Sequence, residues 1–86
     1  ESGVTFMAEA HATLTGQPGI AFVTRGPGAC NASIGIHAAK QSSTPVIMFV
    51  GLINTNDRDK EAFQEFDLPQ MFGSLTKWAT VIDRAE

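Results

Sequence analysis

The sequence predicts an α/β fold with a parallel sheet, and two observations carry that prediction. The segments 19–24 and 46–50 are short, apolar and bounded by Gly or Pro, as expected of strands whose two faces are both covered by helices. Helical segments precede, separate and follow them, an order typical of parallel strands joined by right-handed crossovers. Since two strands are too few for a stable open sheet, we expect a three-layer α/β/α domain of which this chain is a central part.

The first predicted helix runs from Ser2 to Leu14, and Gly16 stands where a helix C-cap is expected. Apolar or small residues recur on one face of this helix, the pattern of an amphipathic helix. They are Gly3, Phe6, Met7, Ala10 and Leu14. The first strand, Gly19 to Thr24, follows directly.

A glycine turn, Gly26-Pro27-Gly28, is predicted between this strand and a second helix from Ala29 to Gln41. Such a turn places bare backbone N–H groups at the carboxyl edge of the sheet, where ligands of open α/β folds bind. The pattern Gly-x-Gly-x-x-Asn lacks the third glycine of the dinucleotide fingerprint, so we do not expect a phosphate cradle. One face of the second helix is predicted to be buried: Ala29, Ala32, Ile36 and Ala39.

The rest of the chain alternates between polar breaks and apolar segments. Ser42-Ser43-Thr44-Pro45 ends the second helix, and Val46 to Val50 forms the second strand. The further expected elements are a polar loop at 54–60, a short helix at 68–72 and a packed segment at 77–81. We expect Trp78 to anchor the core in that last segment.

Composition narrows the function classes. The chain has 86 residues, a net charge of −3 and scattered basic residues, so nucleic acid is not an expected partner. The longest apolar run, Pro45 to Ile53, is too short to span a membrane. With one cysteine and no visible signal peptide, we expect a cytoplasmic location. No His, Cys or carboxylate cluster has metal-ligand spacing, so no metal site is predicted in this chain.

Four motifs follow one another along the chain: Glu1 with Phe6-Met7-Ala8, Leu14-Thr15-Gly16-Gln17-Pro18-Gly19, Gly26-Pro27-Gly28-Ala29 with Asn31, and Ala62-Phe63-Gln64-Glu65 with Thr76-Lys77. In this order and spacing they resemble the N-terminal pyrimidine-binding (PYR) domain of thiamine-diphosphate enzymes, in the acetolactate synthase and pyruvate oxidase-like group. The resemblance covers nearly the whole chain. It implies a thiamin-diphosphate-binding fold in which residues 1–86 are part of that domain, and a second domain, absent here, that holds the diphosphate and Mg²⁺.

The resemblance also implies roles for individual residues. Glu1 matches the catalytic glutamate, whose carboxyl group exchanges a proton with the aminopyrimidine of the cofactor. Thr24, Pro27 and Asn31 match cofactor-contacting positions, and Phe63 and Gln64 match a pair that lines the active-site entrance. Without the resemblance, Glu1 is a favourable charge at a helix start. Without the resemblance, the Asn31 side chain belongs to the hydrogen bonding of the first helical turn. Phe63 is then a core residue, and the neighbouring Gln64 is exposed to solvent.

The implied function is a thiamine-diphosphate-dependent enzyme that decarboxylates or ligates small 2-oxo acids. The resemblance further implies a homo-oligomer, with the cofactor shared between subunits, and an inactive chain when the diphosphate half is missing. Some relatives bind FAD, which nothing in this sequence indicates. Because Gly51 to Asn56 departs from the family's Gly-Gln-Val-Pro-Arg-Arg loop, the particular substrate is not carried over. The alternative is a non-catalytic, truncated α/β module that self-associates or binds a partner.

Overall fold

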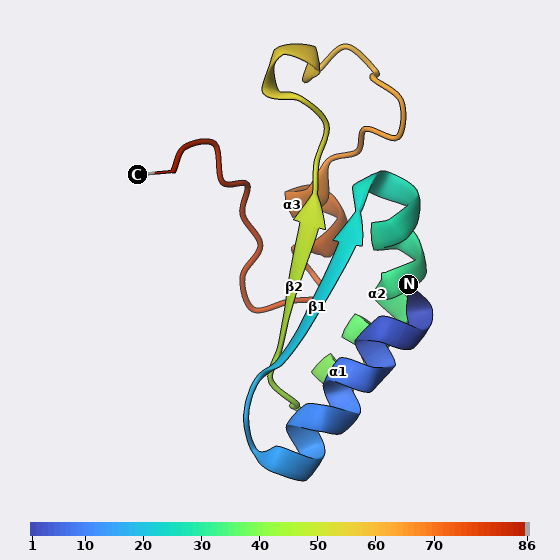
Figure 1. Cartoon of the computed structure of the whole chain (residues 1–86), viewed down its shortest axis with the longest axis vertical. Coiled ribbons are helices and arrows are strands. Elements are labelled where there is room, and N and C mark those ends of the chain that lie inside the picture. The colour runs from blue at the N-terminus through green and yellow to red at the C-terminus, as the bar shows by residue number, and fades with distance from the viewer. Residues whose placement is uncertain (86) are drawn as a thin grey trace.

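The computed structural model describes residues 1–85 and confirms an α/β fold with a parallel sheet. Its elements are, in order, α1 (Ser2–Thr15), β1 (Gly19–Thr24), α2 (Arg25–Gln41), β2 (Val46–Gly51), the 3-10 turn η1 (Thr55–Asp57) and α3 (Leu68–Phe72). β1 pairs with β2 from Gly19 opposite Val46 to Thr24 opposite Gly51. Figure 1 shows both strands pointing to the same end of the molecule, with α1 and α2 running beside them. No helix within residues 1–85 has the length and apolar character needed to cross a bilayer.

The two faces of the sheet differ in what covers them. The face that includes Gly19 and Ala21 is buried under helices. The opposite face leaves four large apolar side chains exposed: Ile20, Phe22, Ile47 and Phe49. The rings of Phe22 and Phe49 stack there with their centroids 5.0 Å apart. The strands are therefore apolar on both faces, as predicted, and residues 1–85 supply the helices for one of them.

The buried face of α2 confirms the predicted periodicity. Ala29, Ala32, Ile36 and Ala39 are all buried. Phe72 of α3 is 2% exposed and clusters with Ala29 and Ile36, and β2 adds Val46, Met48 and Val50 to this cluster. The small residues of α2 thus pack within the chain, and α2 and α3 together close the core over β2.

The buried face of α1 is not the face on which the larger apolar residues recur. Thr5, Ala8 and Ala12 are the buried residues of this helix, whereas Leu14 of the apolar face is 86% exposed. The cause is a close approach of backbones. A Cβ atom at Gly35 of α2 would lie 2.2 Å from Thr5 Oγ1, and one at Gly19 of β1 would lie 2.0 Å from the Ala8 carbonyl oxygen. Only small side chains fit between elements this close, so the larger apolar side chains face outward.

Substitution of Thr5 by Val is expected to destabilise the contact between α1 and α2. The buried Thr5 hydroxyl donates a hydrogen bond to the Ala32 carbonyl oxygen at 2.9 Å. Losing this bond costs about 1–2 kcal/mol, which we expect to lower the thermal unfolding midpoint. Thr13→Val is the matched control because Thr13 is exposed on the same helix. Equal midpoints for the two variants would contradict this role of Thr5.

The prediction for Trp78 was wrong, since its side chain is 77% exposed. The aromatic residue that packs in the core is Phe72, with Leu75 and Ala79 around the same cluster. The segment 77–81 has no helix or strand to direct Trp78 inward. The short helix at 68–72 and the C-cap at Gly16, which has a φ of 72°, are both confirmed.

Candidate functional site

Helix α2 begins at Arg25, directly after β1, so the predicted glycine turn is in fact the first turn of the helix. Backbone N–H groups of a first helical turn have no acceptor within the helix, and Pro27 therefore removes no helical hydrogen bond. The change of direction between strand and helix is absorbed by Arg25, which has a φ of 52°. This left-handed conformation is uncommon for a residue other than glycine. It allows the strand to pass into the helix without a loop.

The Glu1 carboxylate lies against the first two turns of α2. Asn31 Nδ2 donates a hydrogen bond to Glu1 Oε2 at 3.3 Å. A Cβ atom at Gly28 would lie 3.7 Å from Glu1 Cγ and 3.8 Å from Oε1, so the carboxylate rests on the side of the helix that Gly28 leaves bare. Glu1 and Asn31 are both exposed. The structure thus brings together two of the predicted site residues from positions that are distant in sequence.

The segment containing Phe63 and Gln64 docks on the start of α2 through its main chain. The Gly26 N–H donates to the Gln64 carbonyl oxygen at 2.9 Å, and Arg25 Nη1 donates to the Phe63 carbonyl oxygen at 3.1 Å. The Phe63 side chain is 77% exposed, so it is not part of the core that residues 1–85 form. Figure 1 shows this loop, after β2, at the end of the sheet toward which both strands point.

Thr24 and Pro27 complete the set of predicted residues. Pro27 is exposed and stands between Gly26, which contacts Gln64, and Gly28, which contacts Glu1. Thr24 ends β1, and its hydroxyl lies 3.4 Å from the place where a Cβ of Gly51 would be. No hydrogen bond joins the Thr24 hydroxyl to Glu1 or Asn31 in the part of the chain that the structure describes. Pro27 therefore links the two contacts, while Thr24 faces β2.

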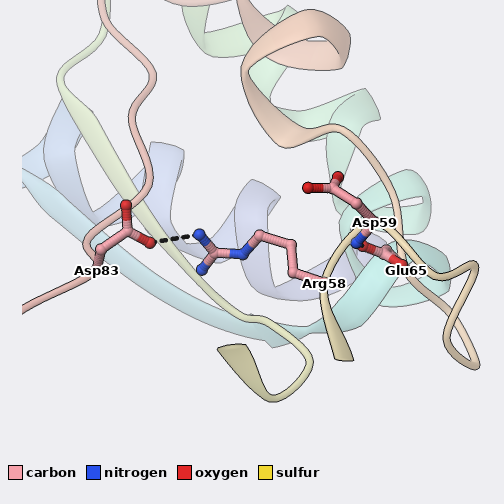
Figure 2. A network of polar contacts seen from close by, with 4 residues as sticks. All are labelled: Arg58, Asp59, Glu65 and Asp83. Atoms are coloured by element: carbon pink, nitrogen blue, oxygen red, sulfur yellow. Dashed lines mark hydrogen bonds and ion pairs between the residues drawn. The ribbon is translucent and has the colours of Figure 1, made fainter. Parts of the chain in front are cut away.

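Glu65 is a residue that the sequence reasoning did not single out. Its Oε2 accepts a hydrogen bond from the Asp59 N–H at 2.7 Å, and its Oε1 accepts one from the Ala62 N–H at 3.1 Å. The Asp59 bond is the main cause that lowers the pKa of Glu65 below its ordinary value of 4.5. Figure 2 shows this carboxylate beside Asp59, with Arg58 pairing to Asp83 at 2.5 Å. Its place in the Ala-Phe-Gln-Glu motif was the available signal, but a carboxylate in a polar loop is usually solvated.

The Glu1 carboxylate at the start of α2 is held through only one of its two oxygens. Asn31 holds one carboxylate oxygen of Glu1, while Oε1 accepts no hydrogen bond from the described residues. A Cβ atom at position 28 would lie in ordinary van der Waals contact with this carboxylate, so glycine leaves the surface beside it bare. A carboxyl group anchored on one oxygen and open on the other can exchange a proton with a ligand. Within residues 1–85, no group of three or more His, Cys, Asp or Glu side chains could hold a metal ion.

Comparison with known proteins places these residues in context. The family described as thiamine pyrophosphate enzyme, N-terminal TPP binding domain, matches residues 1–71. The acetolactate synthase of Bacillus subtilis is 37% identical over 82 residues, which are 95% of this chain and 14% of that protein. The mitochondrial acetolactate synthase catalytic subunit of Saccharomyces cerevisiae is 36% identical over 86 residues, 100% of this chain and 12% of that protein. The acetolactate synthase large subunit of Lactococcus lactis is 40% identical over 78 residues, 91% and 14% of the respective chains. The chain thus spans less than a sixth of the length of these relatives.

Proposed function

The chain belongs to the family of thiamine pyrophosphate enzyme N-terminal domains, and from this premise we propose that it supplies the cofactor-activating carboxylate of an acetolactate synthase-like enzyme. The substrates of that enzyme are small 2-oxo acids. The observation that supports the proposal is the Glu1 carboxylate, held by Asn31 against Gly28 at the start of α2. The relatives matched over nearly the whole chain are acetolactate synthases.

Each residue at the start of α2 has a role in this proposal. Glu1 exchanges a proton with the ring nitrogen of the aminopyrimidine, and Asn31 keeps its carboxylate oriented toward the ring. In this proposal the ring lies beside Pro27 in the first turn of α2, and Thr24 ends β1 just before that turn. When bound, thiamine diphosphate supplies a carbon nucleophile for the keto group and accepts the electron pair that decarboxylation releases. We assign the diphosphate and its Mg²⁺ to a second domain of the enzyme.

Phe63 and Gln64 form the entrance to the pocket in this proposal. Their carbonyl groups bind Arg25 and Gly26, so the main chain that carries the exposed Phe63 ring is docked on the first turn of α2. An apolar ring at this position limits the access of water and the size of the substrate side chain. Gln64 adds a polar amide that can donate a hydrogen bond to a 2-oxo acid carboxylate.

Cofactor dependence tests the proposal. The natural protein that carries this chain is freed of cofactor by dialysis against a chelator, and release of CO₂ from pyruvate and 2-oxobutyrate is measured. We expect turnover to depend on added thiamine diphosphate and Mg²⁺. Absence of turnover together with absence of thiamine-diphosphate binding by calorimetry would contradict the proposal.

The alternative, a non-catalytic module, has one observation in its favour. The sheet face with Ile20, Phe22, Ile47 and Phe49 is apolar and exposed in this chain, as a surface for self-association would be. The same experiment separates the two functions, because a module of this kind would form oligomers without binding thiamine diphosphate. In the enzyme that we propose, both properties occur together, in a homodimer that shares its cofactor.

Replacement of Asn31 by Ala is expected to reduce kcat/KM by about fivefold, which corresponds to the loss of one hydrogen bond worth ~1 kcal/mol. The Asn31 amide is the group that holds Glu1 Oε2, and the carboxylate turns more freely without it. Steady-state kinetics with a 2-oxo acid measure this change. Cys30→Ala is the control because Cys30 is the exposed neighbour of Asn31 and makes no side-chain hydrogen bond in residues 1–85. A loss of the same size in both variants would contradict the role of Asn31.

A further inference from the structure

The segment between η1 and α3 has no regular secondary structure beyond turns, yet its backbone is strongly bent. Three of its residues have positive φ: Asp59 at 62°, Glu61 at 50° and Gln64 at 66°. None of them is glycine, so each conformation is intrinsically unfavourable and needs support from surrounding contacts. The structure must therefore contain a group that holds this segment in place.

The Glu65 carboxylate is that group. It reaches back along the chain and accepts hydrogen bonds from two backbone N–H groups, those of Asp59 and Ala62. The Glu65 N–H in turn donates to the Ala62 carbonyl oxygen at 2.9 Å. The Glu65 side chain thus ties residues 59 and 62, which precede Phe63 and Gln64, to residue 65, which follows them. Hydrogen bonds to an ionised carboxylate are stronger than those between neutral groups, and the Asp59 hydrogen bond lowers the pKa of Glu65 because it favours the ionised form.

The closed turn places two of its carbonyl oxygens against the first residues of α2. The carbonyl oxygens of Phe63 and Gln64 point at Arg25 and Gly26, and the fit is tight because a Cβ atom at Gly26 would lie 3.0 Å from the Gln64 oxygen. Arg58, on the other side of Asp59, pairs with Asp83 and anchors the beginning of the segment. Figure 2 shows that Glu65 and this ion pair flank Asp59.

We propose that Glu65 is a positioning residue that holds Phe63 and Gln64 at the entrance of the pocket by closing the turn 59–65 against the start of α2. This role rests on the proposed function. Glu65 does not touch the reacting groups, and it acts through the backbone of the two residues before it. Its removal should affect how the 2-oxo acid is bound more than how the cofactor is bound.

The test compares three variants of the natural protein that carries this chain. In Glu65→Gln one acceptor oxygen becomes an NH₂ donor, which cannot accept a hydrogen bond from a backbone N–H. Glu65→Asp keeps both acceptor oxygens on a shorter side chain. Glu61→Gln removes the same charge from the same segment at an exposed residue whose side chain makes no hydrogen bond in the described chain, and it serves as the matched control.

Two readouts are needed. Kinetics give KM and kcat for the 2-oxo acid together with the dissociation constant of thiamine diphosphate, and hydrogen–deuterium exchange by mass spectrometry follows the amides of 25–28 and 59–66. For Glu65→Gln we expect KM to rise about tenfold, an unchanged cofactor dissociation constant and faster exchange in both segments. We expect Glu65→Asp to recover part of each change and Glu61→Gln to match the wild type.

Two results would overturn this role. Unchanged exchange in Glu65→Gln would show that the carboxylate does not hold the turn. Faster exchange in Glu65→Gln with the KM and kcat of the wild type would show that Glu65 stabilises the turn without affecting how the substrate is bound. If Glu65→Gln does not fold, the same two measurements are made on Glu65→Asp. The role of Glu65 is then contradicted unless Glu65→Asp shows both faster exchange and a raised KM. A wild-type protein without thiamine-diphosphate-dependent turnover would overturn the proposed function itself, an outcome distinct from the others because it concerns the unsubstituted protein.

Discussion

Replacement of Glu1 by Gln is expected to reduce the turnover of 2-oxo acids at saturating thiamine diphosphate by about a hundredfold or more, the usual contribution of a proton-transferring side chain. The amide of Gln has the size of the carboxyl group, and its oxygen can still accept the hydrogen bond from Asn31. It cannot exchange a proton with the pyrimidine ring. The substitution therefore removes the chemistry of Glu1 and leaves the geometry of the site in place.

Steady-state kinetics on the natural protein that carries this chain measure the effect, with calorimetry to show that the cofactor still binds. Glu9→Gln is the matched control because Glu9 lies in α1, the helix that begins directly after Glu1, and the substitution removes the same charge. We expect this control to remain within about twofold of wild type, as for substitutions away from a site. A Glu1→Gln enzyme with the activity of the control would contradict the assignment of Glu1.

Gly19→Ala is expected to destabilise the fold by about 3 kcal/mol, at the upper end of the range for overpacked sites. The added Cβ would lie 2.0 Å from the Ala8 carbonyl oxygen and 2.9 Å from Ala8 Cα. These are backbone atoms, so no side-chain rotation relieves the clash, and α1 must move away from the sheet. Gly19 also donates its N–H to the Pro45 carbonyl oxygen at 2.9 Å, which resists a compensating shift of β1.

Thermal unfolding and amide exchange in α1 measure this effect. Gly3→Ala is the control because Gly3 lies in α1 and a Cβ there meets no atom within 4 Å. We expect the control to be stabilised by about 0.5–1 kcal/mol, since alanine favours the helix over glycine. Unfolding midpoints that rank Gly19→Ala at or above Gly3→Ala would contradict the close packing of α1 on β1.

Much of the fold could be predicted from local pattern alone. The first strand has the predicted bounds, Gly19 to Thr24, because an apolar run between Pro18 and the glycines of α2 has few other conformations open to it. The buried face of α2 was predicted correctly for a similar reason. Its small and branched residues recur at helical spacing, and burial follows periodicity where one face is clearly more apolar than the other.

The orientation of α1 could not be predicted in this way. Its most apolar face, with Met7 and Leu14, is exposed, and its buried face consists of Thr5, Ala8 and Ala12. The choice between these faces depends on Gly19 and Gly35, glycines in other elements that allow α1 to approach closely. This close approach depends on residues of other elements, so it cannot be predicted from the periodicity of α1 alone.

For the candidate site, the sequence predicts residues, and the structure adds how they are arranged. The family resemblance singled out Glu1 and Asn31, and the structure adds that these residues are hydrogen-bonded. The docking of Gln64 on Gly26 escaped prediction because it is formed by main-chain groups, which have the same chemistry at every residue. The same holds for Glu65, whose partners are two backbone N–H groups.

Activation of the cofactor by Glu1 is tested most directly at the cofactor itself. The measurement is the rate at which the C2 proton of bound thiamine diphosphate exchanges with deuterium, followed by NMR after rapid quenching, in the wild-type natural protein and in Glu1→Gln at full cofactor occupancy. We expect exchange to be about a hundredfold slower or more in Glu1→Gln, with cofactor affinity and unfolding midpoint unchanged. Equal exchange rates in the two proteins would contradict the central claim that this chain supplies the activating carboxylate.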